Sequence, residues 1–239
     1  MAARLSRQEM KRDEVLETAS RFFRYVTEHT RGLLMLLAGI VALVLVGVGI
    51  YAYSQSRVEI ANGLFAQALA VYEADIDEVD SDPDDANHPT FASADARDLR
   101  AHELFQEVEA GYGGTSVGRI AGVYLGKLAL RRGDAERARE LWESFVSAES
   151  DHMLATEVRV NLLAMDRAEG MGEEVVAKLQ ELIGSPSPEL PMEVALDQLA
   201  STLEDLGRHE EARDIYQRIV DEHPSSPYSP RARQKLSSL

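Results

Sequence analysis

The residues whose spacing could bind a metal ion are Asp80, Asp82 and Asp84. Carboxylates at alternate positions can converge on Ca²⁺ at the start of a calcium loop. The rest of that pattern is missing, because Asp85 stands where the loop requires glycine and Phe91 stands where it requires a bidentate glutamate. We therefore predict a solvated acidic loop without a specific metal site. Weak binding of divalent cations is the alternative.

Three other kinds of chemistry lack the residues that they need in this chain. A phosphate-binding loop needs four residues between its glycines and Ser or Thr after its lysine, whereas Gly122 and Gly126 are separated by three residues and Leu128 follows Lys127. The chain has no cysteine, which excludes thiol nucleophiles, thiolate metal sites and disulfides. Its six histidines have no spacing typical of a zinc site. We predict a protein that is not an enzyme and that uses no cofactor and no metal.

The charge is distributed unevenly along the chain. The 239 residues hold 25 basic and 41 acidic groups, and seven of the basic and five of the acidic groups lie in residues 1–31. The net charge is therefore +2 in that segment and −18 in residues 54–239. Such an acidic region repels the phosphates of nucleic acids. We predict no nucleic-acid partner.

An uncharged apolar stretch of 21 residues runs from Leu33 to Tyr53 and reads LLMLLAGIVALVLVGVGIYAY. At about 1.5 Å per residue, a helix of this length crosses roughly 30 Å of hydrocarbon. Arg31 and Arg57 bracket the stretch, and tyrosines near one end favour the headgroup level. We predict a transmembrane helix over residues 32–54. A buried core helix and a cleaved signal peptide are the weaker alternatives, because the stretch is long for both.

The elements on either side of the span set its orientation. Basic residues near a span favour the cytoplasmic side, so we predict a cytoplasmic segment at residues 1–31 and a domain at 55–239 outside the cytoplasm. Ser6 and Glu9 form a capping box, after which Val15, Ala19 and Phe22 begin an apolar stripe. The predicted amphipathic helix either lies on the cytoplasmic lipid headgroups or is a short solvated helix. Both interpretations remain open.

Beyond an expected helix at residues 58–79 and the acidic loop at 80–96, the chain repeats itself every 37 residues. A fixed period of this length is typical of a helical solenoid, in which each unit packs against its neighbours. A small or β-branched residue, a large residue four positions later and an apolar residue three positions after that recur in each unit. These residues are Ala101, Phe105 and Val108; Ala138, Trp142 and Phe145; Val175, Leu179 and Leu182; and Ala212, Tyr216 and Ile219.

The last unit resembles the tetratricopeptide repeat, a pair of antiparallel helices. The residues that carry the resemblance are Leu196, Leu199, Ala200 and Leu203 in the first helix, Gly207 in the turn, Ala212, Tyr216 and Ile219 in the second helix, and Pro224 at the end of the unit. Gly133 and Gly170 stand at the same place in the two preceding units. The resemblance implies an all-α fold with a single N-terminal transmembrane helix and a tetratricopeptide-like α-solenoid of about four helical-hairpin units. A capping helix is expected at about 228–239.

This layout is similar to that of bacterial inner-membrane proteins with a tetratricopeptide-like domain, including the ancillary subunit family of the SecYEG translocon. The resemblance implies a membrane-anchored scaffold with a periplasmic repeat domain, whose partners are envelope proteins or chaperones, including the Sec translocon. The alternative is a self-associating structural protein of the envelope or of cell division. The residues expected on the partner-binding face, on the first helices of the units, are Val123, Lys127, Arg131, Val160, Ala164, Arg167, Asp197 and Ser201.

Overall fold

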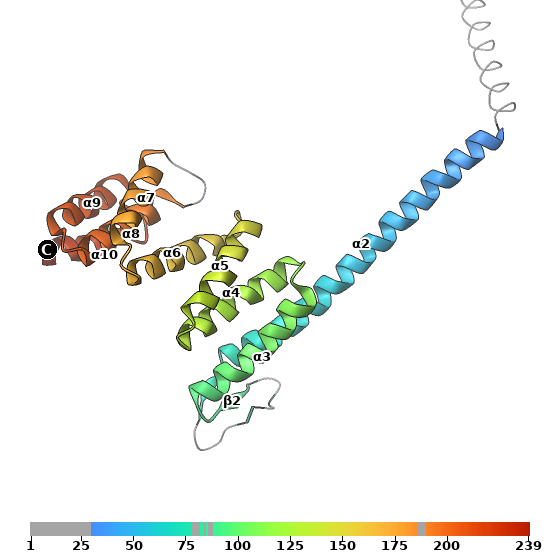
Figure 1. Ribbon diagram of the computed structural model, residues 1–239, viewed down its shortest axis with the longest axis horizontal. Helices are drawn as coiled ribbons and strands as arrows, with labels where there is room; N and C mark the ends of the chain where they lie inside the picture. The colour runs from blue at the N-terminus through green and yellow to red at the C-terminus, as the bar shows by residue number, and fades with distance from the viewer. Residues whose placement is uncertain (1–29, 78–81, 84, 86–87, 186–189) are drawn as a thin grey trace, which may run out of the picture. The chain divides into compact units, whose positions relative to one another are not determined.

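The structure is a computed structural model that describes residues 30–77, 82–83, 85, 88–185 and 190–239. The predicted cytoplasmic helix within residues 1–31 lies almost entirely outside the described residues. The chain divides into two compact units, Met1–Arg57 and Val58–Leu239. In its described part the chain is almost entirely helical, with one long apolar helix at its start and a helical repeat after it (Figure 1). The predicted all-α fold is confirmed.

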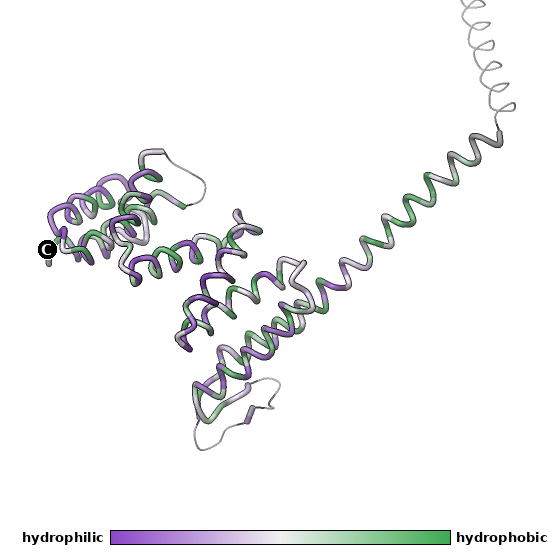
Figure 2. Tube along the Cα trace, in the orientation of Figure 1, coloured by the Kyte–Doolittle hydropathy of each residue, from purple (hydrophilic) through white to green (hydrophobic). Residues whose placement is uncertain are grey.

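The long helix is α2 (Thr30–Tyr72). Between Arg31 and Arg57 most of its residues are Leu, Val, Ile and Ala, and none is proline or charged, so the helical hydrogen bonds continue without a break. Figure 2 shows that the first half of α2 is mostly apolar, whereas the helices of the repeat carry both apolar and polar residues. Every residue from Ala38 to Ser56 is exposed. One helix in the described part is thus long and apolar enough to cross a membrane.

The second unit begins with the last turns of α2, which end earlier than the sequence predicts. The helix expected to run to residue 79 stops at Tyr72, and a two-residue strand β1 (Asp75–Ile76) follows. Strand β1 pairs in parallel with β2 (Thr90–Phe91), in which Phe91 is buried. The expected loop also ends earlier, because the Ser93 hydroxyl accepts a hydrogen bond from the Ala96 amide and starts α3 (Ala94–Tyr112).

Six helices after α3 form the remaining hairpins. They are α4 (Ser116–Arg131), α5 (Ala135–Ala148), α6 (Met153–Ala168), α7 (Gly172–Gly184), α8 (Met192–Asp205) and α9 (His209–Glu222). A shorter helix, α10 (Ser229–Ser238), follows α9 and packs on it. Gly133, Gly170 and Gly207 turn the chain within the three hairpins, and all three have φ between 73° and 86°. Only glycine adopts that conformation without strain, so the turn recurs at the sequence period.

The residues that define the period form the core of the repeat. Ala138, Trp142 and Phe145 are 2% exposed or less, and the corresponding residues of α3 and α9 are completely buried. Leu182 is the exception, being partly buried at the edge of the last core cluster. The small residue lets two helices approach closely and the large residue fills the space beside it. The predicted solenoid register is confirmed.

Candidate partner-binding surface

The eight residues expected on the partner-binding face lie on α4, α6 and α8, the first helices of their hairpins. The structure places four of them in two hollows and separates the other four from these. We call the first the α4 hollow, of about 380 Å³, and the second the α6 hollow, of about 340 Å³. The α4 hollow is lined by Tyr72, Lys127, Leu130, Arg131, Trp142, Glu157 and Asn161. The α6 hollow is lined by Ala164, Arg167, Ala168, Gly170, Gly172, Thr202, Asp205 and Leu206.

Both cations of the α4 hollow are held by carboxylates and aromatic rings. Arg131 donates from Nη1 to Asp98 Oδ1 at 3.0 Å and from Nη2 to the Tyr72 hydroxyl at 2.7 Å. The Arg131 guanidinium also lies 4.8 Å from the Tyr72 ring centroid. Lys127 Nζ lies 2.7 Å from Glu157 Oε1. These contacts fix the position of the charges, while the Arg131 side chain remains 43% exposed and is accessible to a partner.

An aromatic cluster adjoins this hollow through Tyr72, which lines it. The rings of Phe105 and Tyr124 are stacked with their centroids 4.9 Å apart, and Tyr72 meets Tyr124 edge-on at 5.2 Å. Phe65 meets Phe105 at 5.6 Å. Burial raises the pKa of Tyr124 above its ordinary value. Because α2, α3 and α4 each contribute rings, the cluster ties the end of α2 to the first repeat.

The α6 hollow has a single cation, Arg167, whose contacts are looser. Its Nη1 is 3.5 Å from Thr202 Oγ1 and its Nε is 3.9 Å from Asp205 Oδ2. Gly172 closes one side, where an added Cβ would lie only 2.9 Å from Leu206 Cδ2. The backbone of α7 therefore approaches α8 closely at this point, which leaves Arg167 as the main polar feature of the hollow.

Two of the expected residues are buried and therefore do not belong to the partner-binding surface. Val123 is completely buried, and its carbonyl accepts a 3.0 Å hydrogen bond from Trp142 Nε1. Asp197 is also completely buried, because Arg231 of α10 lies over it with Nη1 2.9 Å from Asp197 Oδ2. Helical spacing placed both residues in line with exposed ones, but it does not show which neighbouring helix covers them.

The remaining two expected residues, Val160 on α6 and Ser201 on α8, lie outside both hollows. Val160 is partly buried and packs against the last core cluster. Ser201 Oγ accepts a 3.2 Å hydrogen bond from Arg231 Nη2. The same helix α10 also places Lys235 3.0 Å from Glu204 Oε1, and Glu204 accepts a 2.7 Å hydrogen bond from the Tyr216 hydroxyl. The first-helix face of the last hairpin is thus already occupied by α10.

Sequence reasoning missed several residues that line the hollows, among them Tyr72, Glu157 and Thr202. Tyr72 lies in the helix expected at residues 58–79, where an aromatic beside apolar residues was an available signal. Glu157 and Thr202 carried none, because exposed glutamates and helical threonines are common. Both became visible only through their neighbours across the hairpins.

Metal chemistry has no candidate in the described part of the chain, where no three His, Asp or Glu side chains are grouped to bind an ion. Of the three aspartates in the calcium-like pattern, Asp80 and Asp84 lie outside the described residues. The Asp82 amide donates a 2.7 Å hydrogen bond to Thr90 Oγ1. What the described residues offer is a set of fixed charges beside aromatic and aliphatic surface, which suits recognition of another protein.

A comparison with curated proteins found no match. A comparison with known families agrees with this geometry. The family described as the tetratricopeptide repeat-like domain matches residues 28–239, which covers the apolar helix as well as the repeat. Because that match spans most of the chain and the helices repeat in the same register, the chain belongs to the tetratricopeptide repeat-like domain family.

Proposed function

We propose that this chain is a membrane-anchored protein-interaction scaffold. Its α2 crosses the bacterial inner membrane once, its amino terminus is cytoplasmic and its repeat domain is periplasmic. Its partners are envelope proteins or chaperones, and an ancillary role at the Sec translocon is the most specific form of the proposal. The observation that carries it is a long exposed apolar helix in the same chain as a tetratricopeptide-like repeat.

Exposure of the apolar part of α2 to water would be energetically unfavourable. Leu43, Leu45 and Ile50 are 74%, 65% and 65% exposed, and no residue in the apolar window is buried. Each exposed side chain of this size forgoes about 1.5–3 kcal/mol of burial. A contiguous apolar surface of this kind requires a cover. A bilayer supplies it along the apolar part of α2, and the 21 uncharged residues match the hydrocarbon thickness.

The two hollows combine charged side chains with apolar surface. Lys127 and Arg131 in the α4 hollow and Arg167 in the α6 hollow are held by neighbouring groups, so their side chains lose little freedom when a partner binds. Exposed apolar surface lies beside them at Leu130 and Leu206. A partner segment with apolar side chains flanked by polar ones fits this combination.

Photo-crosslinking in intact membranes tests the surface. A photoreactive amino acid is placed at Lys127, Arg131 or Ala164, and at Arg213 on α9 as an exposed control. We expect crosslinks to a discrete envelope protein from the first three positions and none from the control. Equal crosslinking from all four positions, or none from the hollows, contradicts the proposed surface.

Cysteine labelling tests the topology, and the absence of native cysteine makes it unambiguous. In cells with a permeabilised outer membrane, a membrane-impermeant maleimide labels Ser238→Cys and leaves Ser6→Cys unlabelled until the inner membrane is opened. The reverse pattern overturns the orientation. Sedimentation of the purified chain in detergent separates the alternative function, because a homo-oligomer without co-purifying proteins favours a self-associating structural role.

A further inference from the structure

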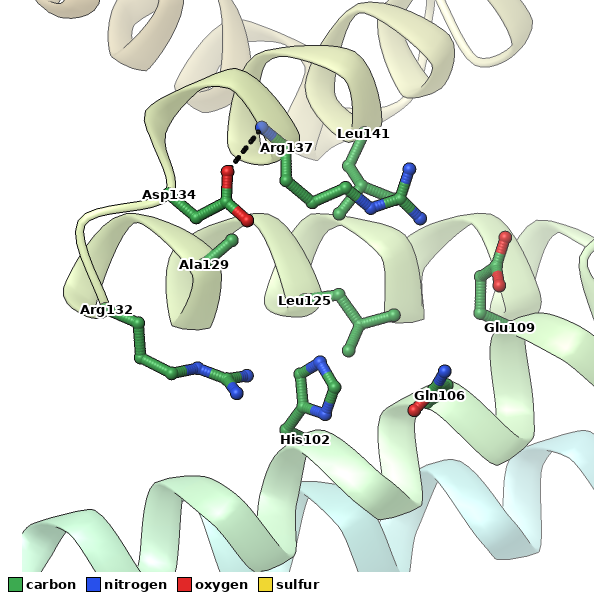
Figure 3. A pocket seen from close by; sticks show the side chains of 9 residues that line it. All are labelled: His102, Gln106, Glu109, Leu125, Ala129, Arg132, Asp134, Arg137 and Leu141. Atoms are coloured by element: carbon green, nitrogen blue, oxygen red, sulfur yellow. Dashed lines mark hydrogen bonds between the residues drawn. The ribbon is translucent and has the colours of Figure 1, made fainter.

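A separate pocket of about 370 Å³ lies between α3, α4 and α5, apart from both hollows. Figure 3 shows its side chains converging from the three helices and from the turn between α4 and α5. Its lining combines charged groups with an aliphatic floor. The lining residues are His102, Gln106, Glu109, Leu125, Ala129, Arg132, Asp134, Arg137 and Leu141.

One end of this pocket is cationic. Arg132 reaches towards His102 in Figure 3. Among the described residues, the Arg132 guanidinium makes a single 3.5 Å hydrogen bond, from Nε to the Leu128 carbonyl, and no ion pair. Arg137 also extends over the pocket, although its Nη1 is bound to Glu140 Oε2 at 2.9 Å. Arg132 is therefore a charged donor group whose Nη atoms are free to bind a ligand in the described structure.

The acidic groups around the pocket do not neutralise that end. Asp134 is used as a helix cap, its Oδ1 accepting a 3.1 Å hydrogen bond from the Arg137 amide. Glu109 lies beside Gln106 at the opposite end in Figure 3. Glu103, the next residue on α3, pairs with Arg100. Between the two ends, Leu125, Ala129 and Leu141 form the apolar floor.

The titration of His102 reflects these surroundings. Burial is the largest cause lowering its pKa below the ordinary value, and the positive charge of Arg132 is the next. Glu103 opposes them by raising the pKa, and Arg137 has the smallest effect, which lowers it. The imidazole is consequently neutral at pH 7, with one nitrogen able to donate a hydrogen bond. A neutral donor beside a free guanidinium is a suitable arrangement for a single carboxylate.

We propose that this pocket binds a peptide carboxylate next to an apolar side chain, with Arg132 and His102 on the carboxylate and Leu125 and Leu141 on the apolar group. A monoanion is favoured over a phosphate dianion because Glu109 and Asp134 also line the pocket and repel the second charge. The site is independent of the first-helix hollows, so the chain has two distinct surfaces for peptide segments.

The test is a titration of the full chain in detergent with ¹³C-labelled histidine, followed by NMR at His102. The probe is acetyl-Leu-Asp-Leu-amide, and its neutral match is acetyl-Leu-Asn-Leu-amide. We expect the acidic peptide to raise the pKa of His102, because a bound carboxylate stabilises the imidazolium, and the neutral peptide to leave it unchanged. Acetyl-Leu-Asn-Leu with a free carboxyl terminus shows whether a side-chain or a terminal carboxylate is preferred.

Arg132→Gln is expected to lower the affinity for the acidic peptide about tenfold, the usual effect of removing one charged hydrogen-bond donor. Arg213→Gln on α9 is the matched control and retains full affinity. Circular dichroism checks that both variants keep the helical fold. Equal responses to the acidic and neutral peptides, unchanged affinity in Arg132→Gln, or a response to inorganic phosphate alone would each overturn the proposal. The crosslinking result at the hollows is unaffected in every case.

Discussion

The apolar part of α2 and the apolar residues of α8 meet opposite surroundings. Leu, Val and Ala make up most of the apolar residues in both, although α8 also carries four acidic residues. In α8 nine residues are buried, because α7 and α9 pack against it. From Ala38 to Ser56, α2 has no buried residue. The comparison shows that composition makes a helix surface apolar, whereas neighbouring helices decide whether that surface is buried against protein. In our proposal, lipid covers α2.

The largest effect is expected where protein provides the cover. Trp142 is 1% exposed, fills the space beside Gly126 and donates to the Val123 carbonyl. Trp142→Ala is expected to lower the free energy of unfolding of the repeat domain by about 3–5 kcal/mol, since it leaves a large cavity. Urea unfolding followed by circular dichroism measures the loss.

The matched control for that prediction lies in α2. Leu45→Ala removes a side chain that is 65% exposed, so the repeat domain is expected to keep its stability within about 0.5 kcal/mol. A loss below about 1 kcal/mol in Trp142→Ala would contradict the view that this core is tightly packed. An equal loss in both variants would remove the contrast between the two helices.

The second prediction concerns lipid as the cover. Leu45→Arg puts a charge near the middle of the span and is expected to oppose insertion by about 2.5–3.5 kcal/mol. The amount of chain resistant to alkaline extraction of membranes should fall accordingly. Leu130→Arg, at an exposed position of the repeat, serves as the control and leaves extraction unchanged. Unaltered membrane retention of Leu45→Arg would show that α2 is not anchored in lipid.

The third prediction extends the comparison to a buried polar group of α8. Burial is the main cause raising the pKa of Asp197, and Arg231 opposes it by attraction. Arg231→Ala is expected to cost about 1–3 kcal/mol at pH 7, because it leaves a buried carboxylate without its cation. Arg218→Ala, which breaks an exposed pair with Glu222, is the control and costs less than about 0.5 kcal/mol.

The pH dependence of that variant has a definite sign. A carboxyl whose folded pKa is raised favours the folded state below its unfolded pKa and loses that contribution as the pH rises through the folded value. The cost of Arg231→Ala is therefore smaller at pH 4 than at pH 7. Replacing Asp197 by Asn in the same chain should recover part of the loss at pH 7. Thermal unfolding at the two pH values measures both effects, and a pH-independent cost would contradict them.

The smallest effect is expected at a surface ion pair between hairpin helices. Hydrogen bonds from Arg119, with Nε 2.8 Å from Glu149 Oε1, hold the pKa of Glu149 below its ordinary value. This contribution is present above the unfolded pKa and is lost as the pH falls through the folded value. Glu149→Gln should cost about 0.2–1 kcal/mol at pH 7 and flatten the stability curve between about pH 5 and pH 3.

The exposed Glu181→Gln on α7 is the control for this prediction, and it should leave the acid limb of the stability curve unchanged. Thermal unfolding between pH 3 and pH 7 distinguishes the two variants. If Glu149→Gln retains the full acid limb, the ion pair with Arg119 contributes nothing measurable.

The sequence by itself determined the long apolar helix and the register of the repeat. A 37-residue period in residues such as Ala138, Trp142 and Gly170 is a property of the chain, because each unit must bury the same face in the same way. The sequence predicted the helix boundaries at Tyr72 and Ala94 less accurately than the repeat. The short strand pair and the Ser93 cap, which set these boundaries, depend on contacts across the acidic segment.

Only the tertiary structure decided which first-helix residues a partner can reach. Helical spacing treats Val123 and Lys127 alike, yet Val123 lies under Trp142 of α5 and Lys127 remains partly exposed. Asp197 is covered by Arg231, 34 residues later in the chain. The pocket between α3, α4 and α5 likewise forms from three helices whose side chains show no common motif. Periodicity shows which residues recur at the same position of each unit, whereas the side chains that cover a given residue are set by packing, within the hairpin for Val123 and from α10 for Asp197.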